Sequence, residues 1–457
     1  MSKLLFNEFD SVTSKQWKQK IQFDLKGADY NETLIWKTPE GIDVKPFYNR
    51  GDFDGNFPAS NTKSTQWNIC QTIFVNDVEK SNKKAQEIIE KGAESIKFII
   101  PNDSISIPHL IENIDIATIP LYFEFQFLSE KFIGQFSKIQ NKNNLFILND
   151  IIGNLARSGN WFNTLQDDHT KFERIVDQIN GFSIDVLLYQ NAGATMVQQL
   201  AYALAHVNEY LNHFGSKLSK EQKQSLKVVF NVAVGTNYFF EISKLRALRV
   251  LWKTLATEYN FSTSCHIIAT PTKRNKTLYD YNTNMLRTTT ESMSAILGGA
   301  NTICSLPYDA IYHKNNEFGE RIARNQLLVL KHESYFDKVN NPSDGTYYIE
   351  SLAHQLSEKA LELFKDIETN GGFLNQLKEG TIQRKIKKSA NEEQSRFDEG
   401  NDILLGTNKY PNSNDKMKHE LELFPFVKTN QRKTLIEPII EKRLAEKLEQ
   451  ERLKTED

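Results

Sequence analysis

Residues 185–195 read Asp-Val-Leu-Leu-Tyr-Gln-Asn-Ala-Gly-Ala-Thr, and they join two different hydrophobic patterns. The run Ser183–Leu188 is largely apolar, which is typical of a strand buried on both faces. Gly193 permits a tight backbone approach, and Thr195 can cap a helix that we predict over Met196–Phe214. The stretch therefore predicts a buried strand, a turn and an amphipathic helix in succession, which is the repeating unit of α/β folds.

The same alternation extends through the middle of the chain. Eight runs of this kind are separated by stretches with helical periodicity such as Val78–Lys91. Such a series over roughly 240 residues matches a closed (β/α)8 TIM barrel, although a doubly wound sheet would also alternate in this way. We favour the barrel because of the strand count, and because no Gly-x-Gly-x-x-Gly follows the first run. The runs are Trp67–Ile73, Ser95–Ile100, Leu121–Phe127, Leu145–Leu148, Ser183–Leu188, Val228–Val234, His266–Ala269 and Thr302–Leu306.

Composition divides the chain into three predicted parts. Residues 1–60 are polar and aromatic with weak periodicity, and they are interpreted as an N-terminal arm laid over another surface. Residues 61–400 should hold the barrel and its trailing helices, and residues 401–457 a linker-like tail. The tail is expected to end in a charged helix over Pro438–Glu456, either a solvated linker remnant or a partner-binding element. The trailing helices are predicted over Ile322–Glu333, Leu352–Asn370 and Phe373–Ala390, with a break at Gly371-Gly372.

Bulk properties exclude several classes of function. The 457 residues carry a formal net charge of −2, so no basic excess is present to neutralise nucleic-acid phosphates. Three scattered cysteines, Cys70, Cys265 and Cys304, make neither a disulfide framework nor a zinc motif. The N-terminus does not resemble a signal peptide, and no apolar run approaches the length of a membrane span. We therefore expect a cytoplasmic protein with no membrane or nucleic-acid partner.

Familiar catalytic motifs are missing from the sequence. It contains no P-loop, no Gly-x-Ser-x-Gly elbow and no His-Glu-x-x-His pair. His206 and His213 lie two helical turns apart, and we interpret both as packing residues.

Several segments in order resemble one enzyme family. The stretch 185–195 resembles a barrel strand end and loop of the adenosylcobalamin-dependent acyl-CoA mutases, in particular of the methylmalonyl-CoA mutase family. Together with the other segments, the resemblance covers roughly residues 15–430, in family order. The other similar segments are Trp36–Tyr48, Val234–Trp252, Asn284–Thr288, Arg321–Asn325 leading into Glu333-Ser334, Pro342–Glu350 and Gly406–Tyr410.

The resemblance fails where the family carries its chemistry. In the family's catalytic chains a Tyr-His pair precedes the x-Gln-x-Ala-Gly-Ala-Thr run, and this chain has Leu187 and Leu188 there. A leucine can neither donate a hydrogen bond to a thioester carbonyl nor carry charge. We therefore predict no catalytic residue in this chain. A vestigial barrel-site motif would remain, consisting of Gln190, Asn191, Gly193 and Thr195.

Further departures concern the family's cofactor and coenzyme A. The loop Gly55–Trp67 lacks the tyrosine and arginine found in catalytic chains, and Ile267–Lys273 replaces an Arg-Thr-His-Ser-like stretch that helps hold coenzyme A. The triplet Asp167-Asp168-His169 begins like the cobalt-ligand motif Asp-x-His-x-x-Gly, but Phe172 takes the glycine position, so His169 is interpreted as a solvated loop histidine. The sequence also stops where the linker to a cobalamin domain would run, so we expect this chain to bind no cofactor.

The resemblance implies a role as the small, non-catalytic subunit of a heterodimer. A larger catalytic chain would hold adenosylcobalamin and interconvert (R)-methylmalonyl-CoA and succinyl-CoA. Trp17, Trp36 and Tyr48 of the arm are the candidate subunit contacts. Two alternatives stay open: an active mutase barrel that works with a separate cobalamin-binding polypeptide, and a repurposed barrel that binds a different ligand.

Overall fold

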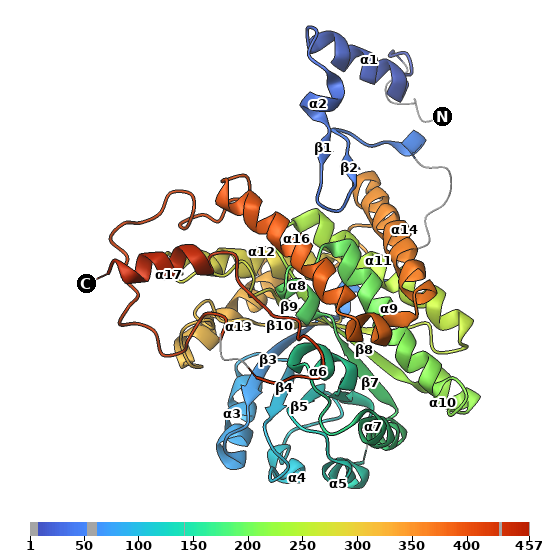
Figure 1. The fold of residues 1–457 in the computed structure, drawn as a ribbon, viewed down its shortest axis with the longest axis vertical. Helices are drawn as coiled ribbons and strands as arrows, with labels where there is room; N and C mark the ends of the chain where they lie inside the picture. Colours follow the sequence, from blue (N-terminus) through green and yellow to red (C-terminus); the bar gives the residue numbers. More distant parts are fainter. Residues whose placement is uncertain (1–7, 53–61, 141, 429–431, 457) are drawn as a thin grey trace.

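The computed structural model describes residues 8–52, 62–140, 142–428 and 432–456. Its centre is a sheet of eight parallel strands in the order β6-β5-β4-β3-β10-β9-β8-β7, which curls into a barrel (Figure 1). The predicted TIM barrel is thereby confirmed. The strands are β3 (Asn68–Phe74), β4 (Ser95–Ile100), β5 (Leu121–Phe125), β6 (Leu145–Leu148), β7 (Gly181–Asp185), β8 (Lys227–Val234), β9 (His266–Pro271) and β10 (Thr302–Cys304).

The ring of strands is nearly closed between β6 and β7. The Ser183 amide lies 3.5 Å from the Asn149 carbonyl oxygen, at the outer limit of a hydrogen bond. A side chain makes the stronger link, because the Asp185 amide donates to Asp150 Oδ2 at 2.7 Å. We call this junction the seam.

All eight predicted runs contain a strand, and the run Ser183–Leu188 extends too far. Strand β7 ends at Asp185, Val186 adopts a right-handed helical conformation, and α8 (Leu187–Asn191) follows. The prediction of a strand through Leu188 is therefore wrong. A short buried helix and a buried strand are both continuously apolar, so periodicity does not separate them.

Helices cover the outside of the barrel, and α14 to α16 pack beyond it (Figure 1). The break at Gly371-Gly372 is confirmed, since Gly371 has φ +94°. The helix predicted over Phe373–Ala390 is divided at Gly380, which has φ +72°. The helices are α3 (Val78–Glu90), α4 (Ile107–Leu110), α5 (Glu130–Ile133), α6 (Ile151–Ser158), α7 (Leu165–Ile179), α9 (Met196–Phe214), α10 (Lys220–Ser225), α11 (Tyr238–Glu258), α12 (Thr283–Leu297), α13 (Glu317–His332), α14 (Tyr347–Thr369), α15 (Gly372–Lys378) and α16 (Thr381–Asp398).

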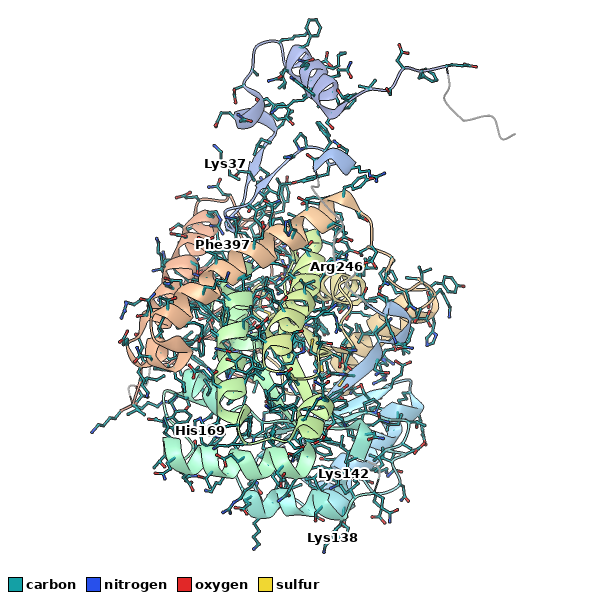
Figure 2. The ribbon with its side chains drawn as sticks, turned by 90° about the vertical axis from the view of Figure 1, so that its right-hand side faces the viewer. Lys37, Lys138, Lys142, His169, Arg246 and Phe397 are labelled. Carbon is teal, nitrogen blue, oxygen red and sulfur yellow. The ribbon has the colours of Figure 1, made fainter. Side chains whose placement is uncertain are left out.

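The N-terminal segment stands away from the barrel (Figures 1 and 2). It contains α1 (Ser14–Asp24), α2 (Tyr30–Leu34) and an antiparallel hairpin of β1 (Trp36–Lys37) and β2 (Asp43–Val44). Thr13 and Gln16 form a capping box that starts α1. Lys37 lies where this segment meets the barrel (Figure 2).

The C-terminal segment runs back across the barrel before its last helix (Figure 1). The helix predicted over Pro438–Glu456 is shorter, because α17 spans Glu446–Lys454. It is also not a fully solvated element, since Glu446 and Glu449 are 5% and 0% exposed. Residues 432–445, which we call the strap, form neither helix nor strand. Across the described ranges, no helix has the length and apolar character that a bilayer span requires.

Candidate functional site

The motif at 185–195 lies at the carboxyl ends of the strands, the face that carries the functional loops in TIM barrels. Leu188 is fully buried in the hydrophobic core, and Leu187 is half-buried on the same short helix. Gly193 has φ +94°, and Thr195 caps α9 with a capping box completed by Gln198. The predicted turn and helix cap are confirmed, whereas the leucines lie on α8 rather than at a strand end.

Gln190 bridges α8 to a buried ion pair on α11. Its Nε2 donates to Glu241 Oε1 at 3.1 Å, and its Oε1 accepts from Lys244 Nζ at 2.7 Å. Lys244 and Glu241 lie 2.6 Å apart with side chains 3% and 0% exposed. Both polar ends of Gln190 are therefore committed to the scaffold.

Asn191 joins the loop that follows β9 to the strap. Its Oδ1 accepts from Thr272 Oγ1 at 2.7 Å, and its Nδ2 donates to Glu441 Oε1 at 3.0 Å. The Lys442 amide donates to the Asn191 carbonyl oxygen at 3.1 Å. Asn191 is thus a structural junction through which the strap is fastened over the barrel.

Further bonds hold the strap to the same face. The Ile439 amide donates to Ala156 and the Leu444 amide to Arg274. Arg157 lies 2.6 Å from both Asp185 and Glu441, and these carboxylates raise the pKa of its guanidinium although burial opposes them. The strap therefore covers part of the face where a TIM barrel usually receives its ligand.

A cleft of about 770 Å³ remains beside the motif. Its walls include the hairpin, the loop Gly193–Thr195, the start of α11 and the end of α16. Glu40 at the hairpin tip accepts from the Met196 and Val197 amides, each at 2.9 Å, and burial raises the pKa of its carboxyl group. The hairpin thereby satisfies the free amides at the start of α9.

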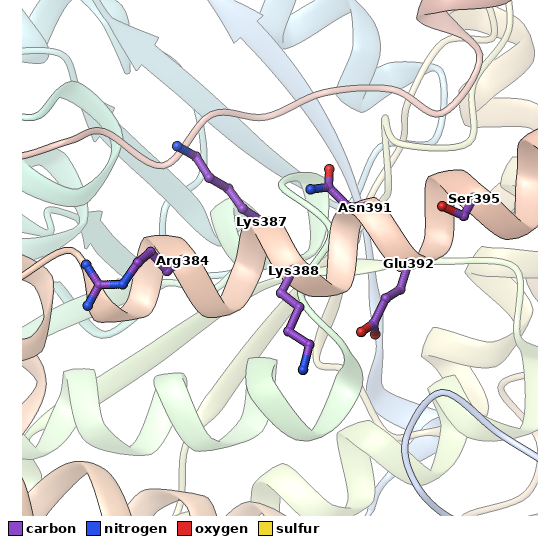
Figure 3. Close-up of a pocket in the computed structure, with 6 residues that line it drawn as sticks. All are labelled: Arg384, Lys387, Lys388, Asn391, Glu392 and Ser395. Carbon is purple, nitrogen blue, oxygen red and sulfur yellow. The ribbon is translucent and has the colours of Figure 1, made fainter.

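A shallower groove of about 450 Å³ runs along α16 (Figure 3). Its six lining side chains all come from this one helix, so no second element opposes them. Lys387 already pairs with Glu437 of the strap. The groove consequently lacks a built binding site. The lining residues are Arg384, Lys387, Lys388, Asn391, Glu392 and Ser395.

Aromatic rings fill the amino-terminal half of the barrel axis. Tyr122 and Phe146 stack at 5.1 Å, and Phe146 lies 4.6 Å from the His266 ring. The Tyr122 hydroxyl is within hydrogen-bond distance of Thr302 Oγ1 (2.6 Å) and His266 Nε2 (3.0 Å). A ligand could not thread through this part of the axis without displacing these rings.

His266 makes stability depend on pH. Burial, Arg249 and Lys227 lower its pKa to about 3, against about 6.5 in an unfolded chain. Its contribution is complete above pH 6.5 and is lost as the pH falls, since the unfolded state then binds the proton first. We expect the free energy of unfolding of the native chain, measured with urea, to fall between pH 7.5 and pH 5.0. This fall should be about 2 kcal/mol larger than the fall in His266→Gln. Equal losses in the two proteins would contradict this assignment.

The three predicted contact residues of the arm differ in their surroundings. Trp17 and Trp36 are 51% and 49% exposed, and Tyr48 is half-buried. Trp36 packs on Phe240 and Tyr48 on Tyr348, with ring centroids 5.8 and 5.3 Å apart. Trp17 contacts Phe47 within the arm. Through these ring contacts Trp36 and Tyr48 pack on the barrel helices, whereas Trp17 packs only within the arm.

His169, His206 and His213 all lie on helices, and His213 is half-buried with its Nε2 2.8 Å from Glu173. His206 is fully buried and bonds Tyr189 and Asp150, which confirms it as a packing residue. His169 is on helix α7 rather than in a loop (Figure 2), so that prediction is wrong; its Nδ1 lies 2.8 Å from the Leu165 carbonyl oxygen. In the parts of the chain that the structure describes, no group of three or more metal-ligating side chains could hold an ion. Residues 55–61 of the loop Gly55–Trp67 lie outside the described residues.

The parallel eight-stranded barrel, with its loops gathered at the carboxyl ends of the strands, defines a TIM-barrel protein. Residues 140–455 match the family model described as methylmalonyl-CoA mutase. The methylmalonyl-CoA mutase small subunit of Porphyromonas gingivalis is 33% identical over 443 residues, which cover 89% of this chain and 71% of that protein. The chain belongs to the methylmalonyl-CoA mutase family.

Longer relatives are matched over less of their length. The methylmalonyl-CoA mutase of Rhizobium meliloti is 27% identical over 88% of this chain and 65% of that protein. The mitochondrial methylmalonyl-CoA mutase of Homo sapiens is 25% identical over 86% of this chain and 60% of that protein. The chain thus spans less than two thirds of these two relatives.

Proposed function

We propose that this chain is the small, non-catalytic subunit of a cytoplasmic, adenosylcobalamin-dependent methylmalonyl-CoA mutase. A larger partner chain would interconvert (R)-methylmalonyl-CoA and succinyl-CoA. The observation that carries the proposal is the state of the motif at 185–195. Leu188 is fully buried where the family's catalytic chains have a histidine, and the polar residues after it are bonded within the chain.

The reaction requires polar groups that touch the substrate. A donor aimed at a thioester oxygen stabilises the charge that develops there, an effect of a few kcal/mol. Leu187 and Leu188 have no such group. Gln190 is held by Glu241 and Lys244, and Asn191 is held by Thr272 and the strap. The motif therefore serves the scaffold in this chain.

The cofactor of the family does not fit this barrel face. Adenosylcobalamin supplies, when bound, an organic radical by homolysis of its cobalt–carbon bond. A corrin lying over the carboxyl ends of the strands would meet the strap, which is bonded to Ala156, Asn191 and Arg274. His169, whose segment only begins like the cobalt-ligand motif, has its Nδ1 2.8 Å from the Leu165 carbonyl oxygen of its own helix. We assign cofactor binding to the partner.

The arm offers a contact surface for that partner. Every residue of α1 is exposed except Ile21, which is half-buried. Trp17 and Phe23 on this helix are 51% and 79% exposed, and Phe9 before it is 74% exposed. Exposed aromatic side chains gathered on one projecting element are typical of interaction sites. We therefore assign the centre of the contact to α1, with Trp36 and Tyr48 at its edge.

The direct test is a pull-down of the tagged full-length chain from its native cytosol, followed by mass and corrin analysis of the complex. We expect a one-to-one complex with a larger chain that carries the corrin. A free monomer or homodimer without a corrin-bearing partner would refute the proposal and favour a repurposed barrel. Mutase activity gained by adding a separate cobalamin-binding polypeptide alone would favour the active-barrel alternative.

The arm is tested by the double substitution Trp17→Ser/Phe23→Ser. We expect the Kd for the isolated partner to rise roughly 10- to 100-fold in calorimetric titration, because two apolar anchors are lost. The thermal midpoint of the free chain should not change, since α1 is exposed. The matched control is Phe424→Ser, which removes a 64% exposed phenylalanine from the C-terminal segment. Equal Kd values for both variants would exclude α1 from the interface.

A further inference from the structure

Two cysteines face each other inside the barrel. Cys70 on β3 and Cys304 on β10 are paired residues of neighbouring parallel strands. They are 0% and 2% exposed, and they belong to the cluster that fills the axis with Tyr122, Leu148 and Ile268. The Cys70 thiol donates weakly to the Gln71 carbonyl oxygen at 4.0 Å.

We propose that Cys70 and Cys304 form a redox-active dithiol, in which a peroxide oxidises Cys304 and Cys70 closes a disulfide. Neighbouring strands lie about 4.8 Å apart, which places paired Cα atoms within the range of roughly 4.4–6.8 Å that disulfides span. Both side chains point to the same side of the sheet because the residues are in register. The bond can therefore form without a change in strand pairing.

The surroundings distinguish the two thiols. The neighbouring Cys70 thiol and the Lys97 cation lower the pKa of Cys304, although burial and the Glu124 carboxylate oppose them. Burial raises the pKa of Cys70. Cys304 is therefore the attacking thiolate and Cys70 the resolving thiol.

A small oxidant can approach from the carboxyl-terminal half of the axis. Glu124, which lies 2.5 Å from Lys97, has a side chain that is 37% exposed although it belongs to a barrel strand. Thr72 and Thr270 are also half-buried rather than sealed. Hydrogen peroxide is close to water in size and can enter the same space that water enters.

The two steps balance without a further reactant. The Cys304 thiolate attacks the O–O bond, so an S–O bond forms and hydroxide leaves. The Cys70 thiol then loses its proton and attacks the sulfenic sulfur, which forms the S–S bond and releases the second oxygen as water. Overall two thiols and one peroxide give one disulfide and two waters. The disulfide joins the first and last strands of the barrel.

The test uses the full-length folded chain treated with one to ten equivalents of hydrogen peroxide. After alkylation of free thiols in denaturant, peptide mass spectrometry should find a Cys70–Cys304 link that has lost two hydrogen atoms and that dithiothreitol reverses. Cys265 is the internal control, because it is buried beside Arg249 and burial raises its pKa. It should stay fully alkylated.

Single variants test the assigned roles. In Cys70→Ser, a dione reagent should trap Cys304 as a sulfenic acid, whereas in Cys304→Ser the remaining Cys70 should stay reduced. Cys265→Ser should form the disulfide at the native rate. The proposal is overturned if Cys70 and Cys304 remain reduced while the half-buried Met285 and Met293 oxidise, or if Cys265 reacts as fast as Cys304. Failure here leaves the subunit role untouched, because the two proposals rest on different residues.

Discussion

Replacing Glu241 with alanine is expected to lower the free energy of unfolding by about 3–5 kcal/mol, because it leaves a buried charge without its partner. Lys244 is 3% exposed and lies 2.6 Å from Glu241. After the substitution its ammonium would retain the neutral acceptors Gln190, Gln199 and the Ala233 carbonyl. The Gly235 amide and Gln190 Nε2 would each lose an acceptor as well.

Urea unfolding at neutral pH measures this effect. Glu258→Ala is the matched control, since Glu258 is an exposed glutamate at the end of the same helix, and we expect a change within about 0.5 kcal/mol. The double substitution Glu241→Leu/Lys244→Met should recover part of the loss because neither charge remains buried. A decrease in the free energy of unfolding below 1 kcal/mol in Glu241→Ala would show that the Glu241–Lys244 pair does not stabilise the barrel.

Gly193→Ala should destabilise the chain by about 2–4 kcal/mol through backbone strain and overpacking. Gly193 has φ +94°, and an added Cβ would lie 2.6 Å from Ala390 Cβ and 2.7 Å from Arg274 Nη2. Arg274 is in turn fixed by Glu393 and by the Lys442 carbonyl oxygen. The loop, α16 and the strap would all have to shift.

A second glycine separates the two causes. Gly345 has φ +77°, but an added Cβ there would meet nothing within 4 Å. Gly345→Ala should therefore cost about 1–2 kcal/mol from backbone strain alone. The difference between the two variants in the free energy of unfolding, measured with urea, gives the cost of overpacking at Gly193 against α16 and Arg274. Equal losses would mean that the loop relaxes away from α16 and the strap.

The fold was readable from the sequence because barrel strands carry a simple signal. Strands covered on both sides are mostly apolar, so runs such as Ser95–Ile100 and Leu145–Leu148 coincide with β4 and β6. The start of α9 was readable as well, since Thr195 and Gln198 carry a local cap. Both signals depend on neighbouring residues alone.

The contacts of the site depend on residues distant in sequence and were not predicted. The bond between Asn191 and Glu441 joins positions that are 250 residues apart. A polar linker pattern describes the strap equally well whether it is solvated or bonded to a barrel. The Glu241–Lys244 pair left a fainter local signal, because an i,i+3 Glu–Lys pair within an otherwise apolar helix face indicates a buried ion pair.

The strap is bonded to the seam, and this position affects how the barrel would respond to force. At the seam a single long backbone contact joins the two strands, and side chains complete the ring: Asp150 receives the Asp185 amide, and Arg157 of α6 holds the Asp185 carboxylate. The same guanidinium grips Glu441. The strap is therefore connected, through Arg157, to the place where the ring of strands is not closed by regular pairing. Tension on the C-terminal segment would reach the seam through Arg157, and the bonds of the strap to Ala156, Asn191 and Arg274 would share the load.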